Sequence, residues 1–251
     1  MKLITLSLFN RYNYTASVLE HLAACHGIKD YVVLPVIDND PKSDNQAAML
    51  KLLSEFAQSG ELKIDMPRFH DTLVGCNANI FTCLNVGFTI TDFVIHIEDD
   101  ILLAKDALQY FEWAKEKYRD DPTVFTVDAY NNESHASFPS AYSVKRAGSF
   151  KPWGWATWVD RWLDIKDRWQ FGYASRPDLP SGGGWDVCMK QALRGDRHRA
   201  FPVLSRAKNI GAFGGCHTPS ADWHWAKHNI KYWSNDLDQL EGKFEEISNG
   251  E

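Results

Sequence analysis

The chain has 251 residues, of which 44% are hydrophobic and 24% charged, and its formal net charge is −6. This length accommodates one large α/β domain or two small ones, and the composition is that of an ordinary globular protein. The negative charge argues against broad electrostatic binding to nucleic acid or to an anionic membrane, although a local basic groove is compatible with it.

The cysteines and the chain start indicate the compartment. Five cysteines without a Cys-x-x-Cys spacing favour free thiols in a reducing compartment over a disulfide framework. No apolar run reaches the ~18 residues of a membrane span. The first ten residues, MKLITLSLFN, turn polar too soon for a secretory signal and instead predict a first strand. We therefore expect a cytoplasmic protein.

Strand-like and helix-like segments alternate through the first half of the chain. Strands are predicted over Leu3–Phe9, Tyr31–Ile37, Leu62–Ile64, Phe93–Ile97 and Val124–Asp128, and helices over Tyr14–Cys25, Gln46–Gln58, Asn77–Val86 and the segment that follows Asp106. This alternation predicts an α/β fold with a Rossmann-like, mostly parallel twisted sheet flanked by helices. In such sheets, ligands bind beyond the carboxyl ends of the strands.

The second half of the chain has a looser pattern. Beyond residue 130, Asn, Ser, Pro and Gly become frequent, and predicted helices are short (Gly184–Leu193 and Ala221–His228). Most of the ten tryptophans lie between Trp153 and Trp225, where they form either a stacking surface for a sugar or part of the core. Because no linker is evident, we expect a single domain, with a nucleotide-binding half at 1–130 and an acceptor-binding half at 131–251.

Three consecutive acids follow the predicted strand in VIHIEDDI, residues 94–101. Such a cluster repels itself unless the carboxylates share a cation, although a solvated loop is the alternative. A divalent ion held there could bind a nucleotide diphosphate. Asp100 is the expected direct ligand, Glu98 would share its face of the strand, and Asp99 would point elsewhere. We count Glu98 and Asp99 among the expected donor-binding residues.

Several segments resemble one enzyme family in the same order along the chain. They are LSLFNRYNYTASVLEHL, IEDDILLAKDALQYF, GSFKPWGWATWVDRW, GGGWDVCMKQALRG and FPVLSRAKNIGAFGG, and the similarity extends over residues 3–215. These segments are similar to the N-acetylglucosaminyltransferase I family of GT-A glycosyltransferases. The resemblance implies inverting sugar transfer from a nucleotide sugar, expected to be a UDP-sugar, with Mn²⁺ or Mg²⁺ as cofactor. It also implies that Arg11 contacts the nucleotide and that Asp38, or alternatively Asp40, reads the uracil ring.

The same resemblance assigns the catalytic base. Asp186 matches the family's base, while Val187 replaces its second acid, and we place Trp185 with the donor-binding residues. Inverting transfer needs a carboxylate that takes the proton of the acceptor hydroxyl, and a glycine-rich loop before Asp186 suits closure over the donor. The alternative role of Asp186 is that of a helix N-cap. Upstream, Asn77 and Asn79 line the donor site or belong to an exposed helix face.

Three histidines cluster in GGCHTPSADWHWAKH. His217 is the candidate second metal ligand or diphosphate contact. His224 and His228 share a helical face, so a zinc site with Cys216 is the second alternative, and ordinary packing is the third.

Two other functions compete with glycosyl transfer. A nucleotidyltransferase would share the metal and the α/β fold, but it needs a glycine-rich basic loop near the N-terminus, and LSLFNRYNYT contains no glycine. A non-catalytic carbohydrate-binding protein would use the tryptophans and has no need of the acids. The acceptor is expected to be a saccharide or another molecule that carries a hydroxyl group, and a modified nucleic-acid base is compatible with the sequence.

Overall fold

The computed structural model describes residues 1–133, 140–169, 185–215, 218–228, 230, 232–237 and 242–247. Its helices are α1 (Tyr12–Ala23), α2 (Asn45–Gln58), α3 (Cys76–Gly87), α4 (Ala107–Tyr118), α5 (Val159–Ile165), α6 (Trp185–Ala192) and α7 (Ala221–His228), with 3₁₀ turns at Ile28–Asp30, Lys166–Arg168 and Ser234–Asp236. Its strands are β1 (Lys2–Leu8), β2 (Tyr31–Ile37), β3 (Arg68–Phe69), β4 (Phe93–Glu98), β5 (Ile101–Leu103), β6 (Val124–Asp128), β7 (Ser143–Ala147), β8 (Trp155–Trp158), β9 (His198–Pro202), β10 (Ala207–Asn209) and β11 (Glu245–Glu246).

Three adjacent strands of the main sheet, β4, β1 and β2, are parallel. β1 lies between β2 and β4, with Lys2 level with Tyr31 and Leu3 level with Val94. β1 and β2 are buried almost throughout because helices cover both faces of the sheet. Their sequences are therefore nearly continuous apolar runs, as is usual for parallel strands. The predicted α/β fold with a largely parallel sheet is confirmed.

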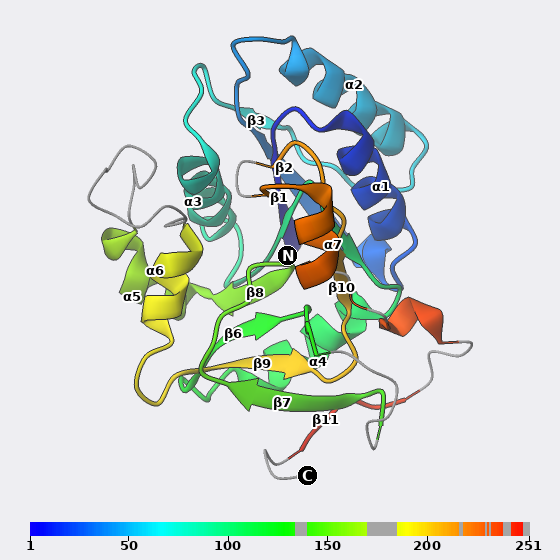
Figure 1. Ribbon diagram of the computed structural model, residues 1–251. Helices are drawn as coiled ribbons and strands as arrows, with labels where there is room; N and C mark the ends of the chain where they lie inside the picture. The colour runs from blue at the N-terminus through cyan, green and yellow to red at the C-terminus, as the bar shows by residue number, and fades with distance from the viewer. Residues whose placement is uncertain are drawn as a thin grey trace.

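Helices cover the two faces of this sheet. One face packs on α1 and α4 in a core that includes Leu19 and Ile95, and the other packs on α3, α5 and α6 in a core that includes Leu84 and Val94. In Figure 1, α3, α5 and α6 lie to the left of the sheet and α1 lies to the right. Ile95 and Val94 face different cores because successive side chains of a strand point to opposite faces.

The second half of the chain extends the same sheet. Among the described residues the strand order is β11-β7-β9-β6-β8-β4-β1-β2-β3, and β5 and β10 form a separate two-stranded sheet. β8 lies between β4 and β6 and is antiparallel to both. Trp155 and Trp158 of β8 are 0% and 1% exposed, so these two rings belong to the core and not to a sugar-stacking surface.

One predicted strand differs from the structure. Leu62–Ile64 contributes only an isolated parallel bridge between Ile64 and Val33. The edge strand beside β2 is β3, which begins at Arg68. Pro67 explains the interruption, because a proline has no backbone N–H to donate to the neighbouring strand.

A buried ion pair ties the C-terminal segment to α4. Asp106 precedes α4, as predicted, but its carboxylate forms no cap; it accepts hydrogen bonds from Nε of Arg206 at 3.0 Å and from the hydroxyl of Ser234 at 2.7 Å. Arg206 also donates to two backbone carbonyls, and its Nη2 lies 2.9 Å from the Asp106 carboxylate, so this fully buried charge is paired. Three segments distant in sequence are thereby held together.

Two further features of the fold are the state of its cysteines and the length of its helices. In the described part of the chain, Cys25 and Cys83 are buried free thiols, as predicted. Of the helices in that part, none combines the length and the apolar character needed to span a bilayer.

Candidate active site

Charged side chains gather at the carboxyl edge of β1, β2 and β4. Arg11 follows β1, Asp38 follows β2, and Asp99 and Asp100 follow Glu98, the last residue of β4. These strands are parallel neighbours, so their carboxyl ends meet at one edge of the sheet. The fold therefore brings to one edge five residues that the sequence predicted for the donor site.

The Arg11 side chain connects the two aspartates. Its Nε donates to Oδ2 of Asp99 at 3.3 Å, its Nη1 donates to Oδ2 of Asp100 at 2.8 Å, and its Nη2 donates to Oδ1 of Asp99. Burial would lower the pKa of Arg11, but the carboxylates of Asp100 and Asp99 outweigh burial and raise it. Arg11 is therefore a permanent cation, and it relieves the mutual repulsion of the acids.

The loop after β10 packs closely on this ion pair. A Cβ atom on Gly211 would lie 2.0 Å from Oδ2 of Asp100 and 3.2 Å from Nη1 of Arg11. Nearby, the hydroxyl of Tyr14 accepts a hydrogen bond from the backbone N–H of Phe213 at 3.0 Å, and the Tyr14 ring centroid lies 5.5 Å from the guanidinium of Arg11. Any larger residue at position 211 would therefore displace the Asp100 carboxylate, which approaches the backbone of Gly211 closely.

Glu98 connects the acidic residues after β4 to helix α3. Its Oε2 accepts a weak hydrogen bond from Sγ of Cys76, in the first turn of α3, at 3.8 Å. Burial raises the pKa of Glu98 well above its usual range, and the charges of Asp100 and Asp99 raise it further. The charge of Asp186 acts in the same direction. Asp186 is thus within electrostatic reach of the acids that end β4.

Asp38 holds a neighbouring loop in this structure. Its carboxylate accepts hydrogen bonds from the backbone N–H groups of Asn39, Val74 and Gly75 at 2.8, 2.9 and 2.8 Å. The side chain is buried, with 3% exposed. Asp38 therefore fixes the start of α3, and its expected contact with a base stays a prediction.

Asp40 joins the loops that follow β1 and β2. Its Oδ2 accepts hydrogen bonds from the side chains of Asn10 and Ser43, each at 2.8 Å, and its Oδ1 accepts one from the N–H of Lys42 at 3.0 Å. These hydrogen bonds, led by that from Asn10, lower the pKa of Asp40. The alternative role of Asp40 in base recognition also stays a prediction.

Asp186 lies in the first turn of α6. It is the second residue of the helix and does not precede it, and its Oδ2 is paired with Nζ of Lys190, one turn later, at 2.5 Å. A quarter of the side chain is exposed to solvent. This position and pairing differ from those of an N-cap.

Trp185 is buried beside Asp186. Its ring is 5% exposed and stacks between Trp155 and Trp169, with centroids 5.7 and 6.1 Å away and interplanar angles of 20° and 10°. Phe150 contacts it edge-on at 5.6 Å. Trp185 therefore anchors α6, and its expected place among the donor-binding residues stays a prediction.

The predicted histidine ligand lies outside the described residues. His217 and Cys216 both fall there, as does the glycine run before Trp185. His224 is buried, with Nε2 at 3.4 Å from the carbonyl oxygen of Asn209, and its ring lies 5.3 Å from that of His228. In the described part of the chain, no group of three or more His, Cys, Asp or Glu residues could hold a metal ion. Among the described residues, the histidines of α7 thus make packing contacts and form no zinc site.

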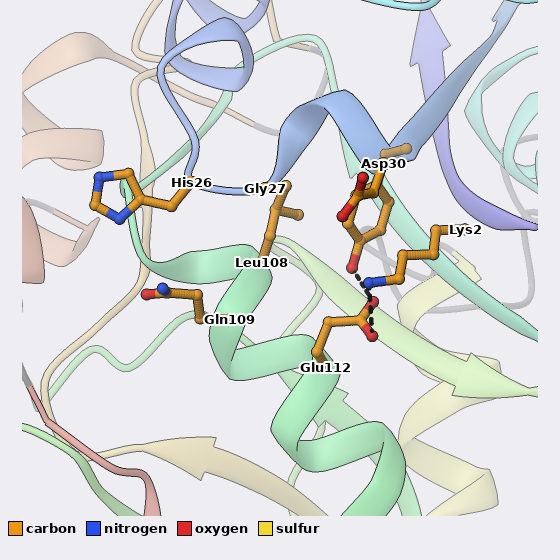
Figure 2. Close-up of a pocket in the computed structure, with 8 residues that line it drawn as sticks. Lys2, His26, Gly27, Asp30, Leu108, Gln109 and Glu112 are labelled. Atoms are coloured by element: carbon orange, nitrogen blue, oxygen red, sulfur yellow. Dashed lines mark hydrogen bonds and ion pairs between the residues drawn. The ribbon is translucent and has the colours of Figure 1, made fainter.

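A cavity of about 320 Å³ lies at the opposite edge of the sheet, where β1 and β2 begin. Figure 2 shows Lys2 directed toward Glu112 of α4, with Asp30 nearby. Nζ of Lys2 lies 3.1 Å from Oε2 of Glu112, and the hydroxyl of Tyr31 donates to the same carboxylate. Lys2 and Glu112 in this cavity are therefore already paired with each other, and the candidate site is the carboxyl edge.

Asn79 is a buried residue for which the sequence also allowed an exposed helix face. It is 4% exposed, and its Nδ2 donates to the carbonyl oxygens of Leu8 and Val36 at 3.2 and 3.4 Å. It thus lies against the ends of β1 and β2. Helical spacing could have revealed this position, because Asn79, Cys83 and Gly87 fall on one buried stripe of α3.

Comparison with curated proteins gives a partial match. No protein-family model matches the chain. An alpha-1,3-mannosyl-glycoprotein 2-beta-N-acetylglucosaminyltransferase of Arabidopsis thaliana is 27% identical over 124 residues, which cover 48% of this chain. The match spans 25% of the length of that relative. The resemblance to N-acetylglucosaminyltransferases that the sequence motifs indicated is confirmed.

Solved structures identify the architecture. The crystal structure of S. aureus TarS 1-349 aligns with a TM-score of 0.51 and 18% identity, over 82% of this chain and 58% of that chain. Its complex with UDP-GlcNAc aligns with a TM-score of 0.52 and 17% identity, over 82% of this chain and 56% of that chain. The chain has the GT-A glycosyltransferase fold. Within this GT-A fold, Arg11 meets Asp99 and Asp100 because β1 and β4 are parallel neighbours.

Proposed function

We propose that this protein is a metal-dependent, inverting glycosyltransferase that moves a sugar from a UDP-sugar to an acceptor hydroxyl. The observation that carries the proposal is the carboxyl edge of the GT-A sheet, where Arg11 pairs with Asp99 and Asp100 and where Asp186 lies within electrostatic reach. The curated relative is named an N-acetylglucosaminyltransferase and TarS was solved with UDP-GlcNAc, so UDP-GlcNAc is the first donor to test.

The two aspartates that follow β4 carry the type of ligand atom that a divalent cation prefers. Asp99 and Asp100 supply carboxylate oxygens, which Mn²⁺ and Mg²⁺ prefer, and these oxygens already hold the positive guanidinium of Arg11. We assign Asp100 as the metal ligand and His217 as a second one. Once bound, the ion would supply Lewis-acid stabilisation of the charge on the departing diphosphate.

The nucleotide is assigned to the residues that follow β1 and β2. Arg11 donates charge-assisted hydrogen bonds to phosphate oxygens, for which the planar guanidinium is well suited. Asp38 or Asp40 accepts a hydrogen bond from the base. Asp40 accepts a hydrogen bond from Asn10, the residue before Arg11, so the loops that follow β1 and β2 are in contact.

Asp186 is assigned as the general base. It takes the proton of the acceptor hydroxyl, and the hydroxyl oxygen then attacks the anomeric carbon while the bond to the diphosphate breaks. A single displacement of this kind inverts the anomeric configuration. The partial exposure of Asp186 lets an acceptor reach it, and the buried ring of Trp185 holds its helix in place.

The acceptor is assigned only by chemical class. We propose a saccharide or another hydroxyl-bearing molecule, with a modified base included in that class, and a cytoplasmic setting consistent with the free thiols. The rival carbohydrate-binding function is less well supported, because Trp155, Trp158 and Trp185 are buried.

Titration of the protein with UDP, with and without Mn²⁺, tests this proposal against its rivals. We expect UDP to bind in the presence of Mn²⁺ and UDP-GlcNAc or another UDP-sugar to raise the melting temperature by mass action. A protein that binds no UDP, with or without Mn²⁺, would instead be a non-catalytic carbohydrate-binding protein. Turnover of a nucleoside triphosphate in place of a UDP-sugar would indicate a nucleotidyltransferase.

A further inference from the structure

The helix that carries Asp186 begins against α3. The backbone N–H of Trp185, the first residue of α6, donates to Oδ1 of Asn77 at 2.7 Å. The first N–H groups of a helix lack partners within that helix, and a side-chain oxygen that accepts from one of them stabilises the helix start. Here the acceptor lies 108 residues earlier in the chain. It therefore fixes where α6 begins in space.

A second contact of Asn77 supports the same arrangement. Its backbone oxygen accepts a hydrogen bond from Nε1 of Trp169 at 3.0 Å. The ring of Trp169 stacks on that of Trp185, with an interplanar angle of 10°. Asn77 therefore holds both members of a stacked pair of tryptophans, one through its side chain and the other through its backbone.

The position of Asn77 is itself fixed through Asp38, a residue assigned to the nucleotide. Gly75, two residues earlier, donates its backbone N–H to Oδ2 of Asp38 at 2.8 Å. Asn77 is the second residue of α3, which packs on β1 and β2. The segment from residue 75 to residue 77 thus connects the carboxyl end of β2 with the first turn of α6.

We infer that Asn77 is a positioning residue for Asp186. Its side-chain oxygen sets where the first turn of α6 lies, and so sets the distance between the Asp186 carboxylate and the acceptor hydroxyl. This inference rests on the proposed function, in which Asp186 is the base. A base acts only within hydrogen-bond reach of the proton that it removes, and a displacement of about 1 Å lowers a rate about 10²-fold.

Three variants test the inference, with Asn85→Ala as the matched control because Asn85 is exposed on the same helix. Asn77→Ala should lower kcat about 10- to 100-fold, leave the donor KM within about twofold, and speed amide hydrogen exchange over residues 185–188. Asn77→Asp keeps an acceptor oxygen and should restore most of the rate and the protection. Asn85→Ala should match the parent in all three measurements.

The outcomes separate this inference from the proposed function. A parent that transfers no sugar refutes the proposed function and the role of Asp186 with it. An active parent with unchanged kcat or exchange in Asn77→Ala refutes the inference alone, as does a rise in KM without a loss of kcat. If Asn77→Ala does not fold, Asn77→Ser, which shortens the side chain but keeps it polar, takes its place with the same expected results.

Discussion

Gly211→Ala is a one-atom perturbation aimed at the acids that end β4. The added Cβ would lie 2.0 Å from Oδ2 and 2.8 Å from Cγ of Asp100, closer than real Cβ atoms approach other atoms, so the carboxylate must move. The displaced Oδ2 is the atom that accepts from Nη1 of Arg11 at 2.8 Å. The substitution therefore separates Arg11 from Asp100 without removing either charge.

The size of the effect follows from this contact. A hydrogen bond between charged groups contributes about 1.5–3 kcal/mol, and partial exposure of the pair reduces that figure. Alanine also restricts the unfolded chain, which offsets about 0.4–1 kcal/mol of the loss. We expect Gly211→Ala to lower the free energy of unfolding by about 1 kcal/mol. The affinity for UDP with Mn²⁺ should fall about tenfold or more, because the displaced Asp100 carboxylate is the assigned metal ligand. A tenfold change in affinity corresponds to about 1.4 kcal/mol.

Urea unfolding and calorimetric titration of UDP with Mn²⁺ measure the two effects. Gly148→Ala is the matched control, since a Cβ at Gly148 meets no atom within 4 Å and its φ is not in the left-handed region. Gly148→Ala should equal or slightly exceed the parent in stability and bind UDP as the parent does. If Gly211→Ala behaved like Gly148→Ala in both measurements, the reasoning about the Arg11–Asp100 contact would be refuted.

Three further predictions concern single side chains. Asp100→Ala should abolish Mn²⁺-dependent UDP binding in calorimetry while the fold persists, and parental affinity would contradict the metal assignment. Asp38→Ala should weaken UDP binding by about 1–3 kcal/mol and speed proteolysis near residues 74–75, where its hydrogen bonds are lost; no change in either would remove Asp38 from the site. Burial lowers the pKa of His96 to about 3. Below pH about 6.5 the histidine therefore takes up a proton in the unfolded chain but not in the folded protein, and the free energy of unfolding falls as the pH falls. From pH 8 to pH 5 this costs about 2 kcal/mol in urea unfolding, and His96→Leu should lose correspondingly less; equal losses in the two proteins would contradict the buried neutral histidine.

Local sequence patterns predicted much of the sheet. Tyr31–Ile37, Val124–Asp128 and Ala221–His228 were predicted at the bounds that β2, β6 and α7 have in the structure. Continuous apolar runs suit strands buried on both faces, and their regular alternation with helices suits parallel connections. The acids after β4 could be placed at the carboxyl edge for the same reason.

Contacts between distant segments could not be predicted in this way. The antiparallel position of β8 between β4 and β6 depends on pairing that no local period records. The hydrogen bonds of Arg11 to Asp99, and of Trp185 to Asn77, join residues 88 and 108 positions apart. The pattern around Trp185 suggested a donor contact, whereas burial against Trp155 and Trp169 was set by the packing of α6 on the sheet.

Sugar transfer by the parent and by Asp186→Asn is the most direct test of the central claim. With Mn²⁺, a UDP-sugar and a hydroxyl acceptor, the parent should release UDP and form a product whose inverted anomeric configuration is visible by NMR. Asparagine keeps the size of the side chain but cannot take a proton, so Asp186→Asn should lower kcat about 10²- to 10⁴-fold with UDP affinity and melting temperature near those of the parent. A retained anomer, or near-normal turnover by Asp186→Asn, would contradict the account.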